Sequence, residues 1–290
     1  MVERLALGTV QFGLEYGVAN RGGQVSAEDA ATILDRALKM GINALDTAIA
    51  YGVSEERLGR IGVKEWNVVT KLPSVPESTN DIDGWVEGAV TGSVRRLQIS
   101  KLYGLLLHDP RQLAGTMGDP LFEALTHLRE QGLVEKIGIS IYHPADLDAI
   151  CGRYSLDLVQ APFNVLDRRL ATSGWLTRLH DAGTEVHVRS AFLQGLLLMP
   201  PGTRPRSFSR WQPVWDRWDQ WLSYSNLTAL RASLGFALSE PGVDRVVVGV
   251  DNLAQLEEIF ATVGQAIPAP PKELMTDDLD LIDPSRWKEL

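Results

Sequence analysis

Eight short apolar runs alternate with helix-like segments along the whole chain, and this alternation most constrains the fold. The runs are nearly continuous in Val, Ile and Leu, which is typical of parallel strands covered by helices on both faces. They span residues 4–13, 42–48, 67–72, 102–109, 134–140, 157–164, 185–192 and 245–250. A strand followed by a helix, repeated eight times, predicts a (β/α)8 TIM barrel.

Helix-like segments fill the intervals between the apolar runs. One has a capping-box-like start at Ser26 and is followed by Gly41, as expected for the two ends of a helix. Others are expected at 54–59, 83–97, 120–131, 144–153, 170–182, 227–238 and 253–263. The alternative fold is a doubly wound open sheet, which normally has a G-x-G-x-x-G turn after its first strand. The segment LGTVQFGLEYG does not have that spacing.

Composition and charge narrow the possible partners and location. The net charge is −9, and no run of Lys or Arg stands out, so we expect no nucleic-acid partner and no anionic membrane surface. No apolar stretch approaches the roughly 20 residues that cross a bilayer, and the N-terminus has no secretory signal pattern. The single cysteine, Cys151, rules out an internal disulfide and fits a reducing compartment. We therefore expect a soluble cytoplasmic protein.

The chain is expected to form one domain over residues 1–290. No composition shift marks a boundary, and the irregular stretch PPGTRPRSFS is interpreted as a loop that follows the seventh strand. The Pro- and Asp-rich segment 265–290 is expected to form a tail over the barrel.

Titratable side chains stand at the ends of three neighbouring predicted strands. Asp46 ends the second strand, with Tyr51 in the loop that follows, while Lys71 and His108 end the third and fourth strands. Barrel enzymes gather their chemistry at these strand ends, so the four side chains should converge. A buried lysine is costly unless a carboxylate pairs with it, and Asp46 is the nearest candidate. Each residue alone has an ordinary structural explanation, but the four together indicate a site.

These four residues resemble the Asp, Tyr, Lys and His tetrad of the aldo-keto reductases in order and approximate spacing. The likeness is carried by DTAIAYG, VVTKL and LLLHDP, and it extends to LGTVQFG, LREQGLVEKIGIS, LVQAPFNVLD, RSAFLQGLL and VVVGVDNLAQLEEI. It covers about residues 4–260. The resemblance implies an NAD(P)H-dependent oxidoreductase that reversibly reduces a small-molecule carbonyl substrate, an aldehyde or ketone that could include a sugar.

The chemistry of carbonyl reduction agrees with this tetrad. A tyrosine with a pKa near ~10 is a poor proton donor for repeated exchange near neutrality. A lysine cation close by would lower that pKa, and a carboxylate would hold the lysine in place. The sequence therefore predicts that Asp46 fixes Lys71, that Lys71 lowers the pKa of Tyr51, and that Tyr51 transfers the proton. His108 would orient the carbonyl and stabilise charge on its oxygen.

The resemblance also implies an extended NADP(H) or NAD(H) cofactor across the barrel mouth. The residues implied to hold it are Thr9, Val10, Asp46, Ser140, Gln160, Arg189, Ser190, Phe192, Gly195, Gly249, Asp251, Asn252 and Gln255. Ser140 and Gln160 match positions that bind the nicotinamide carboxamide. The segment 190–195 should offer backbone N–H groups to the pyrophosphate, and the helix that begins near Asn252 should face the adenosine end.

This chain departs from the family pattern at both ends of that cofactor. Ile141 replaces the usual asparagine, and Arg189 stands where many members place an aromatic ring. No Lys or Arg lies between Arg245 and Lys272, and Asp251 would repel a 2′-phosphate. The family favours NADPH, whereas these residues favour NADH, and the choice stays open.

Two other functions stay open from the sequence. A Schiff-base lyase could use Lys71 as its nucleophile, although Asp46 opposes the deprotonation that this requires. The second alternative is a non-catalytic, nicotinamide-binding regulatory subunit of the same fold. The departures from the family pattern at Ile141 and Arg189 leave this function possible. The resemblance implies that substrate specificity comes from residues 109–119, 193–224 and 265–290. The substrate and the oligomeric state are left open.

Two further groups of residues receive structural interpretations. The tryptophans at 211, 215, 218 and 221 have the spacing of one apolar helix face, and we favour packing over a sugar-binding platform. Cys151 is expected to be structural. The other histidines lack metal-ligand spacing, so no metal site is predicted.

Overall fold

Eight parallel strands close into a barrel in chain order, with β1 paired to both β2 and β8. This computed structural model describes residues 1–289, with side chains described for residues 1–287. The strands are β1 Leu5–Gly8, β2 Ala44–Asp46, β3 Asn67–Leu72, β4 Leu102–Leu107, β5 Val134–Ser140, β6 Leu158–Pro162, β7 Glu185–Arg189 and β8 Arg245–Gly249. The predicted (β/α)8 barrel is confirmed, and closure excludes the open sheet.

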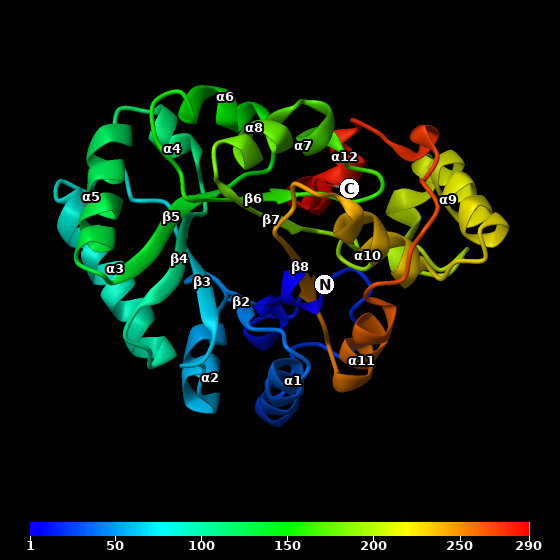
Figure 1. Cartoon of the computed structure of the whole chain (residues 1–290), viewed down its shortest axis with the longest axis horizontal. Coiled ribbons are helices and arrows are strands. Elements are labelled where there is room, and N and C mark those ends of the chain that lie inside the picture. Colours follow the sequence, from blue (N-terminus) through cyan, green and yellow to red (C-terminus); the bar gives the residue numbers. More distant parts are fainter. Residues whose placement is uncertain (290) are drawn as a thin grey trace.

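Helices surround the strands as an outer ring (Figure 1). They are α1 Ala27–Lys39, α2 Ser54–Ile61, α3 Ile82–Leu97, α4 Arg111–Ala114, α5 Gly118–Glu130, α6 Ala145–Ile150, α7 Arg169–Thr172, α8 Trp175–Asp181, α9 Gln212–Tyr224, α10 Ala229–Ser239, α11 Leu253–Thr262 and α12 Leu279–Ile282. The predicted cap of the first helix is present, since the Asp29 N–H donates to Ser26 Oγ at 3.0 Å.

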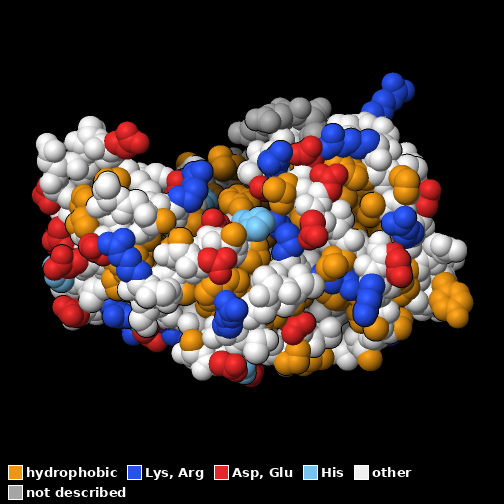
Figure 2. All heavy atoms as spheres, turned by 90° about the horizontal axis from the view of Figure 1, so that it is seen from above, with side chains coloured by type: hydrophobic (Ala, Val, Ile, Leu, Met, Phe, Trp, Pro, Cys, Tyr) orange, Lys and Arg blue, Asp and Glu red, His pale blue; other side chains and the backbone are white. Residues whose placement is uncertain are grey.

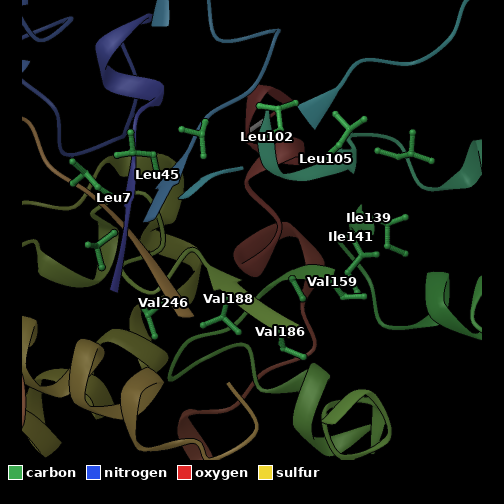
Figure 3. Packing of buried hydrophobic residues seen from close by; sticks show 14 of the residues in the cluster. Leu7, Leu45, Leu102, Leu105, Ile139, Ile141, Val159, Val186, Val188 and Val246 are labelled. Carbon is green, nitrogen blue, oxygen red and sulfur yellow. The ribbon is translucent and has the colours of Figure 1, made fainter. Parts of the chain in front are cut away.

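Alternation of side chains along the strands separates two apolar layers. One face of each strand packs against the helices, as Figure 3 shows for Leu7, Leu105 and Val188. The other face fills the barrel interior with Val69, Leu106 and Leu158.

The same alternation places polar groups at the top of the barrel. Because side chains two residues apart share a face of a strand, the interior residues of β3, β4 and β6 are followed on that face by Lys71, His108 and Gln160. The strand pattern therefore delivers these polar side chains to the C-terminal end of the barrel.

A second apolar cluster lies outside the barrel around α9, which stands at the edge of the molecule in Figure 1. The four tryptophans of this stretch are buried there, and Trp218 is fully buried with its Nε1 donating to Leu197 O at 3.1 Å. The packing interpretation of the tryptophans is confirmed. From the C-terminal segment, Leu274, Leu281 and Ile282 join the same cluster.

Candidate active site

A buried ion pair lies at the C-terminal end of β2 and β3. Lys71 Nζ donates to both carboxylate oxygens of Asp46, at 2.7 Å each, and to Thr47 O at 3.0 Å. The side chains are only 1% and 7% exposed, respectively. Three acceptors satisfy the three N–H groups of the ammonium, so the lysine is fully hydrogen-bonded. The pairing of Lys71 with Asp46 that the sequence predicted is present.

Tyr51 and His108 lie beside this ion pair. Tyr51 is held in the turn after β2, where its N–H donates to Ala48 O at 3.0 Å. Its ring centroid is 5.2 Å from Lys71 Nζ, and its ring meets that of His108 edge-on, with centroids 6.2 Å apart. The structure thus brings together all four residues of the predicted tetrad.

The pKa of Tyr51 differs from the sequence prediction. Burial raises the pKa of Tyr51 above its ordinary value, the Asp46 carboxylate adds to the rise, and Arg189 opposes it. Lys71 does not produce the predicted lowering, because its ammonium is directed at Asp46 and Thr47 O and its charge is balanced there. Desolvation of the phenolate therefore dominates, and Tyr51 remains a protonated phenol at neutral pH.

His108 is neutral at physiological pH. Burial lowers the pKa of His108 from 6.5 to about 4, and the nearby charges of Lys71 and Arg189 contribute to the shift. A neutral imidazole can still donate one hydrogen bond, so this side chain can bind a carbonyl oxygen without being charged.

A cavity of about 510 Å³ opens above these residues, and it includes most of the predicted cofactor contacts. The face of the molecule in Figure 2 is hollowed near its middle, where a His side chain shows among charged and apolar groups. Of the predicted site residues, Gln160 and Asn252 do not line the cavity. Gln160 is fully buried and donates to Asp46 Oδ1 at 2.6 Å. Asn252 instead caps α11, accepting from the Gln255 N–H at 3.0 Å.

Gln160 and Ser140, both predicted to bind the nicotinamide carboxamide, are hydrogen-bonded to each other. Ser140 Oγ donates to Gln160 Oε1 at 3.3 Å. Ser140 still lines the cavity, whereas Gln160 is buried behind it and donates to Asp46. The contact to a carboxamide that the resemblance implied for Gln160 stays a prediction.

The sequence prediction missed several cavity residues. Tyr16, Gly17 and Asn20 line the cavity from the loop after β1. This loop crosses to the opposite rim, where the Val18 N–H donates to Gln194 O at 3.1 Å. The only sequence signal was the richness of this stretch in Gly.

Arg189 is held against the cavity wall by Tyr142, which the sequence prediction also missed. The guanidinium lies 4.3 Å from the centroid of the Tyr142 ring. It donates to Ile141 O at 3.0 Å and to Ser190 Oγ at 3.3 Å. Ile141 thus contributes its carbonyl to the site, while its side chain lies in the core.

The loops after β7 and β8 have the character of an anion site. Leu193, Gln194 and Gly195 have positive φ angles of 48°, 53° and 87°. The backbone N–H groups of Ala191, Phe192 and Gln194 have no hydrogen-bond partner within the part of the chain that the structure describes. Barrels commonly bind phosphate at these two loops, and the first turn of α11 adds free N–H groups. The residues present therefore fit a phosphate-containing cofactor.

Three other features concern the predicted location and chemistry. Among residues 1–289, no group of three or more His, Cys, Asp or Glu side chains is placed to hold a metal ion. None of the described helices is long and apolar enough to cross a membrane. Cys151 is half-buried, and burial raises the pKa of its thiol, which makes it a poor nucleophile.

The fold and the site together define a (β/α)8-barrel protein with a buried acid–lysine pair, a tyrosine and a histidine under one cavity. A sequence profile of the aldo/keto reductase family matches residues 4–273, and the chain belongs to that family. The chain is similar to D-threo-aldose 1-dehydrogenase of a Pseudomonas species, with 27% identity over 88% of this chain and 90% of the relative. It is also similar to the uncharacterised oxidoreductase YqkF of Bacillus subtilis, with 26% identity over 79% and 80% of the two chains.

Solved structures have the same fold. The glycerol dehydrogenase AKR11B4 of Gluconobacter oxydans aligns with a TM-score of 0.71 at 21% identity, covering 91% of this chain and 88% of that one. The holo form of the aldo-keto reductase AKR11C1 of Bacillus halodurans aligns with a TM-score of 0.70 at 23% identity, covering 92% and 88%. Family membership and the relatives named as oxidoreductases support an oxidoreductase.

Proposed function

We propose that the protein is an NAD(P)H-dependent oxidoreductase that reversibly reduces an aldehyde or ketone, sugars included, to an alcohol. The observation that carries the proposal is the buried Asp46–Lys71 pair beside Tyr51 and His108 at the floor of one cavity. Similarity to D-threo-aldose 1-dehydrogenase supports the inclusion of sugars among the substrates.

The cofactor, when bound, supplies the hydride. The free backbone N–H groups after β7 and the first turn of α11 would hold its phosphates, and Ser140 and Arg189 would lie at its nicotinamide end. Tyr51, which burial keeps protonated at neutral pH, would donate its phenolic proton to the carbonyl oxygen as that oxygen becomes an alkoxide. His108, being neutral, would donate a hydrogen bond to the same oxygen. Lys71 and Asp46, paired with each other, would position Tyr51.

Lysine chemistry receives less support from the structure. The Lys71 side chain is 1% exposed and donates to three acceptors. A Schiff-base nucleophile must be neutral and must reach its substrate. Burial lowers the pKa of Lys71, and the contact with the Asp46 carboxylate offsets part of this lowering. We therefore place Lys71 in a supporting role.

The proposal is tested by fluorescence titration of the purified protein with NADH and with NADPH, followed by a panel of carbonyl substrates. We expect binding of at least one dinucleotide. Tyr51→Phe should retain this binding and lose roughly 10²- to 10⁴-fold in turnover, the usual contribution of a general acid. Absence of binding to a folded protein would remove the proposal, and unchanged turnover of Tyr51→Phe would remove the role of Tyr51.

A further inference from the structure

The far end of the cavity, against α11, differs in charge from the end that holds the ion pair. Asn20, Asp251, Gln255 and Glu258 line this far end. Among the described residues that line the cavity, the basic ones are Lys71 and Arg189. Both belong to the other end, where Lys71 binds Asp46 and Arg189 binds Ile141 O. The far end therefore offers two carboxylates and no cation to a bound molecule.

Asp251 has spare capacity to accept hydrogen bonds. Its two side-chain partners are distant, since Asn20 Nδ2 and Gln255 Nε2 each lie 3.4 Å from a carboxylate oxygen. N–H···O hydrogen bonds are normally about 2.9–3.0 Å long, so both contacts are weak. Burial raises the pKa of Asp251, which indicates a carboxylate that has lost water without gaining strong donors. A hydroxyl donor placed here would satisfy it.

The backbone around Asp251 is held by two hydrogen bonds at the start of α11. Gln255 Oε1 accepts from the Asp251 N–H at 2.8 Å, and Asn252 caps the same turn. One turn further along α11, Glu258 extends the acidic wall toward solvent. Arg21 is the arginine of the loop after β1. It follows Asn20 in the chain, but it is exposed and does not line the cavity.

We infer that this end of the cavity selects NAD(H) over NADP(H), with Asp251 accepting a hydrogen bond from a ribose hydroxyl of the adenosine half. The inference rests on the proposed function, because it assigns one member of the cofactor class to the same cavity. The phosphates would bind at the loops after β7 and β8, which places the adenosine ribose beside α11. In doubly wound dinucleotide-binding folds, a carboxylate that accepts a hydrogen bond from the ribose 2′-hydroxyl favours NAD over NADP. A 2′-phosphate carries a charge of about −1.5 to −2 at neutral pH and would meet Asp251 and Glu258 instead of a cation.

The test is a set of dissociation constants for NADH and NADPH, measured by fluorescence titration of the full chain at low and at high salt. ADP and 2′,5′-ADP serve as competitors that lack the nicotinamide. We expect NADH to bind at least about tenfold more tightly than NADPH at low salt, which is the size of effect that one unfavourable charge contact near a surface can produce. ADP should likewise compete better than 2′,5′-ADP. High salt should reduce both preferences, for NADH over NADPH and for ADP over 2′,5′-ADP, because it screens the repulsion between the 2′-phosphate and the carboxylates.

Substitutions locate the source of the preference. Asp251→Asn combined with Glu258→Gln should bring the ratio for the two dinucleotides to within about threefold, mainly through tighter NADPH binding, since the repulsion of the phosphate is removed. Glu257→Gln is the matched control, because Glu257 lies next to Glu258 in α11 but pairs with Arg36 and does not line the cavity. It should leave the ratio unchanged.

The outcomes separate this inference from the proposed function. Equal or tighter binding of NADPH by the wild-type protein would overturn the inference and leave the oxidoreductase intact. A preference for NADH that persists unchanged in the double variant would overturn the role of Asp251 and Glu258. If neither dinucleotide bound to the folded protein, the proposed function would fail, and the inference with it.

Discussion

Asp46 and Lys71 balance each other's charge at a depth where neither side chain could be accommodated alone. Their contacts extend to Gln160, whose amide donates to Asp46 Oδ1 at 2.6 Å. Removing one partner of such a pair leaves an uncompensated buried charge, whereas removing both does not. The stability contributions of these two residues are therefore coupled.

Asp46→Asn should lower the free energy of unfolding by about 3 to 5 kcal/mol, because Lys71 loses its anion inside the barrel. The double variant Asp46→Asn with Lys71→Met should be less destabilised than the sum of the two single variants. Urea unfolding measures all three. Lys39→Met is the control, since its pair with Asp35 is just as short but lies on the surface and should contribute less than about 1 kcal/mol. Additive losses in the double variant would contradict the coupling.

The protonation of His108 should make the fold sensitive to acid. The pKa of His108 is about 4 in the folded protein and 6.5 without the fold. Between these two values the unfolded state binds more protons than the native state, so the stability falls as the pH falls. His108→Gln cannot titrate and should lose less stability than the wild type between pH 7 and pH 4.5, as measured by thermal unfolding.

A comparison with His127 checks the sign of this effect. His127 is exposed, and its hydrogen bond to Asp83 raises its pKa, so its contribution is lost as the pH rises through that raised pKa. His127→Gln should therefore lose at least as much stability as the wild type between pH 7 and pH 4.5. An identical loss of stability in His108→Gln and in the wild type would mean that His108 is not held neutral by the fold.

At the scale of elements, the position of Tyr51 depends on two interlocked loops. A Cβ atom added at Gly13, after β1, would lie 1.8 Å from Tyr51 O. Ser54, at the start of α2, also ties the loops together by donating to Thr9 O at 2.9 Å. The turn that holds the tyrosine is thus shaped by the loop beneath it.

Gly13→Ala should displace the Tyr51 turn and reduce turnover by more than tenfold, because a misplaced catalytic group is costly even at about 1 Å. The stability should fall by about 1 to 3 kcal/mol, as for other overpacked sites. Turnover and urea unfolding are measured together with nucleotide binding, which should be affected less. Gly22→Ala is the control, because its Cβ would meet only Asn20 Oδ1, at 4.0 Å. Full activity in Gly13→Ala would show that the turn does not depend on this contact.

The strands were predictable because both of their faces are buried, one against the surrounding helices and the other in the barrel interior. Burial on both faces imposes a nearly continuous apolar pattern on each strand. The runs at 67–72 and 134–140 match β3 and β5 to the residue. The first run was predicted to continue to residue 13, but β1 ends at Gly8. The Phe12 N–H donates to Thr9 O at 3.0 Å, so a 3-10 turn takes over. An apolar run does not distinguish a strand from such a turn.

The site was predictable where it lies on strands and not where it depends on loops. Lys71 and His108 follow interior residues at a spacing of two, so their direction is fixed by the strand. Tyr16 and Asn20 reach the cavity only because their loop binds the opposite rim through Val18 and Gln194. The pKa of Tyr51 depends on its burial, which no local pattern specifies.

At the scale of the whole molecule, the barrel closes where the first strand meets the last, far apart in the chain. Leu5 to Gly8 pair with Val246 to Gly249. Just before this seam, the Arg4 guanidinium donates to Leu238 O at 2.7 Å, to Glu240 O at 2.8 Å and to Val243 O at 2.6 and 3.1 Å. One side chain from the N-terminus therefore satisfies the carbonyls of the segment that leads into β8.

Arg4→Met should lower the free energy of unfolding by about 2 to 3 kcal/mol, because hydrogen bonds from a charged donor contribute about 1.5 to 3 kcal/mol each and the freed carbonyls can recover part of this loss with water. Urea unfolding followed by tryptophan fluorescence and by circular dichroism measures the loss and checks that the transition stays cooperative. Arg60→Met is the control, since the Arg60 side chain is 76% exposed and its Nη2 is as far as 3.6 Å from Glu56 Oε2. This variant should stay within about 0.5 kcal/mol of the wild type. If Arg4→Met were as mild as the control, the pairing of β1 with β8 would hold the seam without help from the N-terminus.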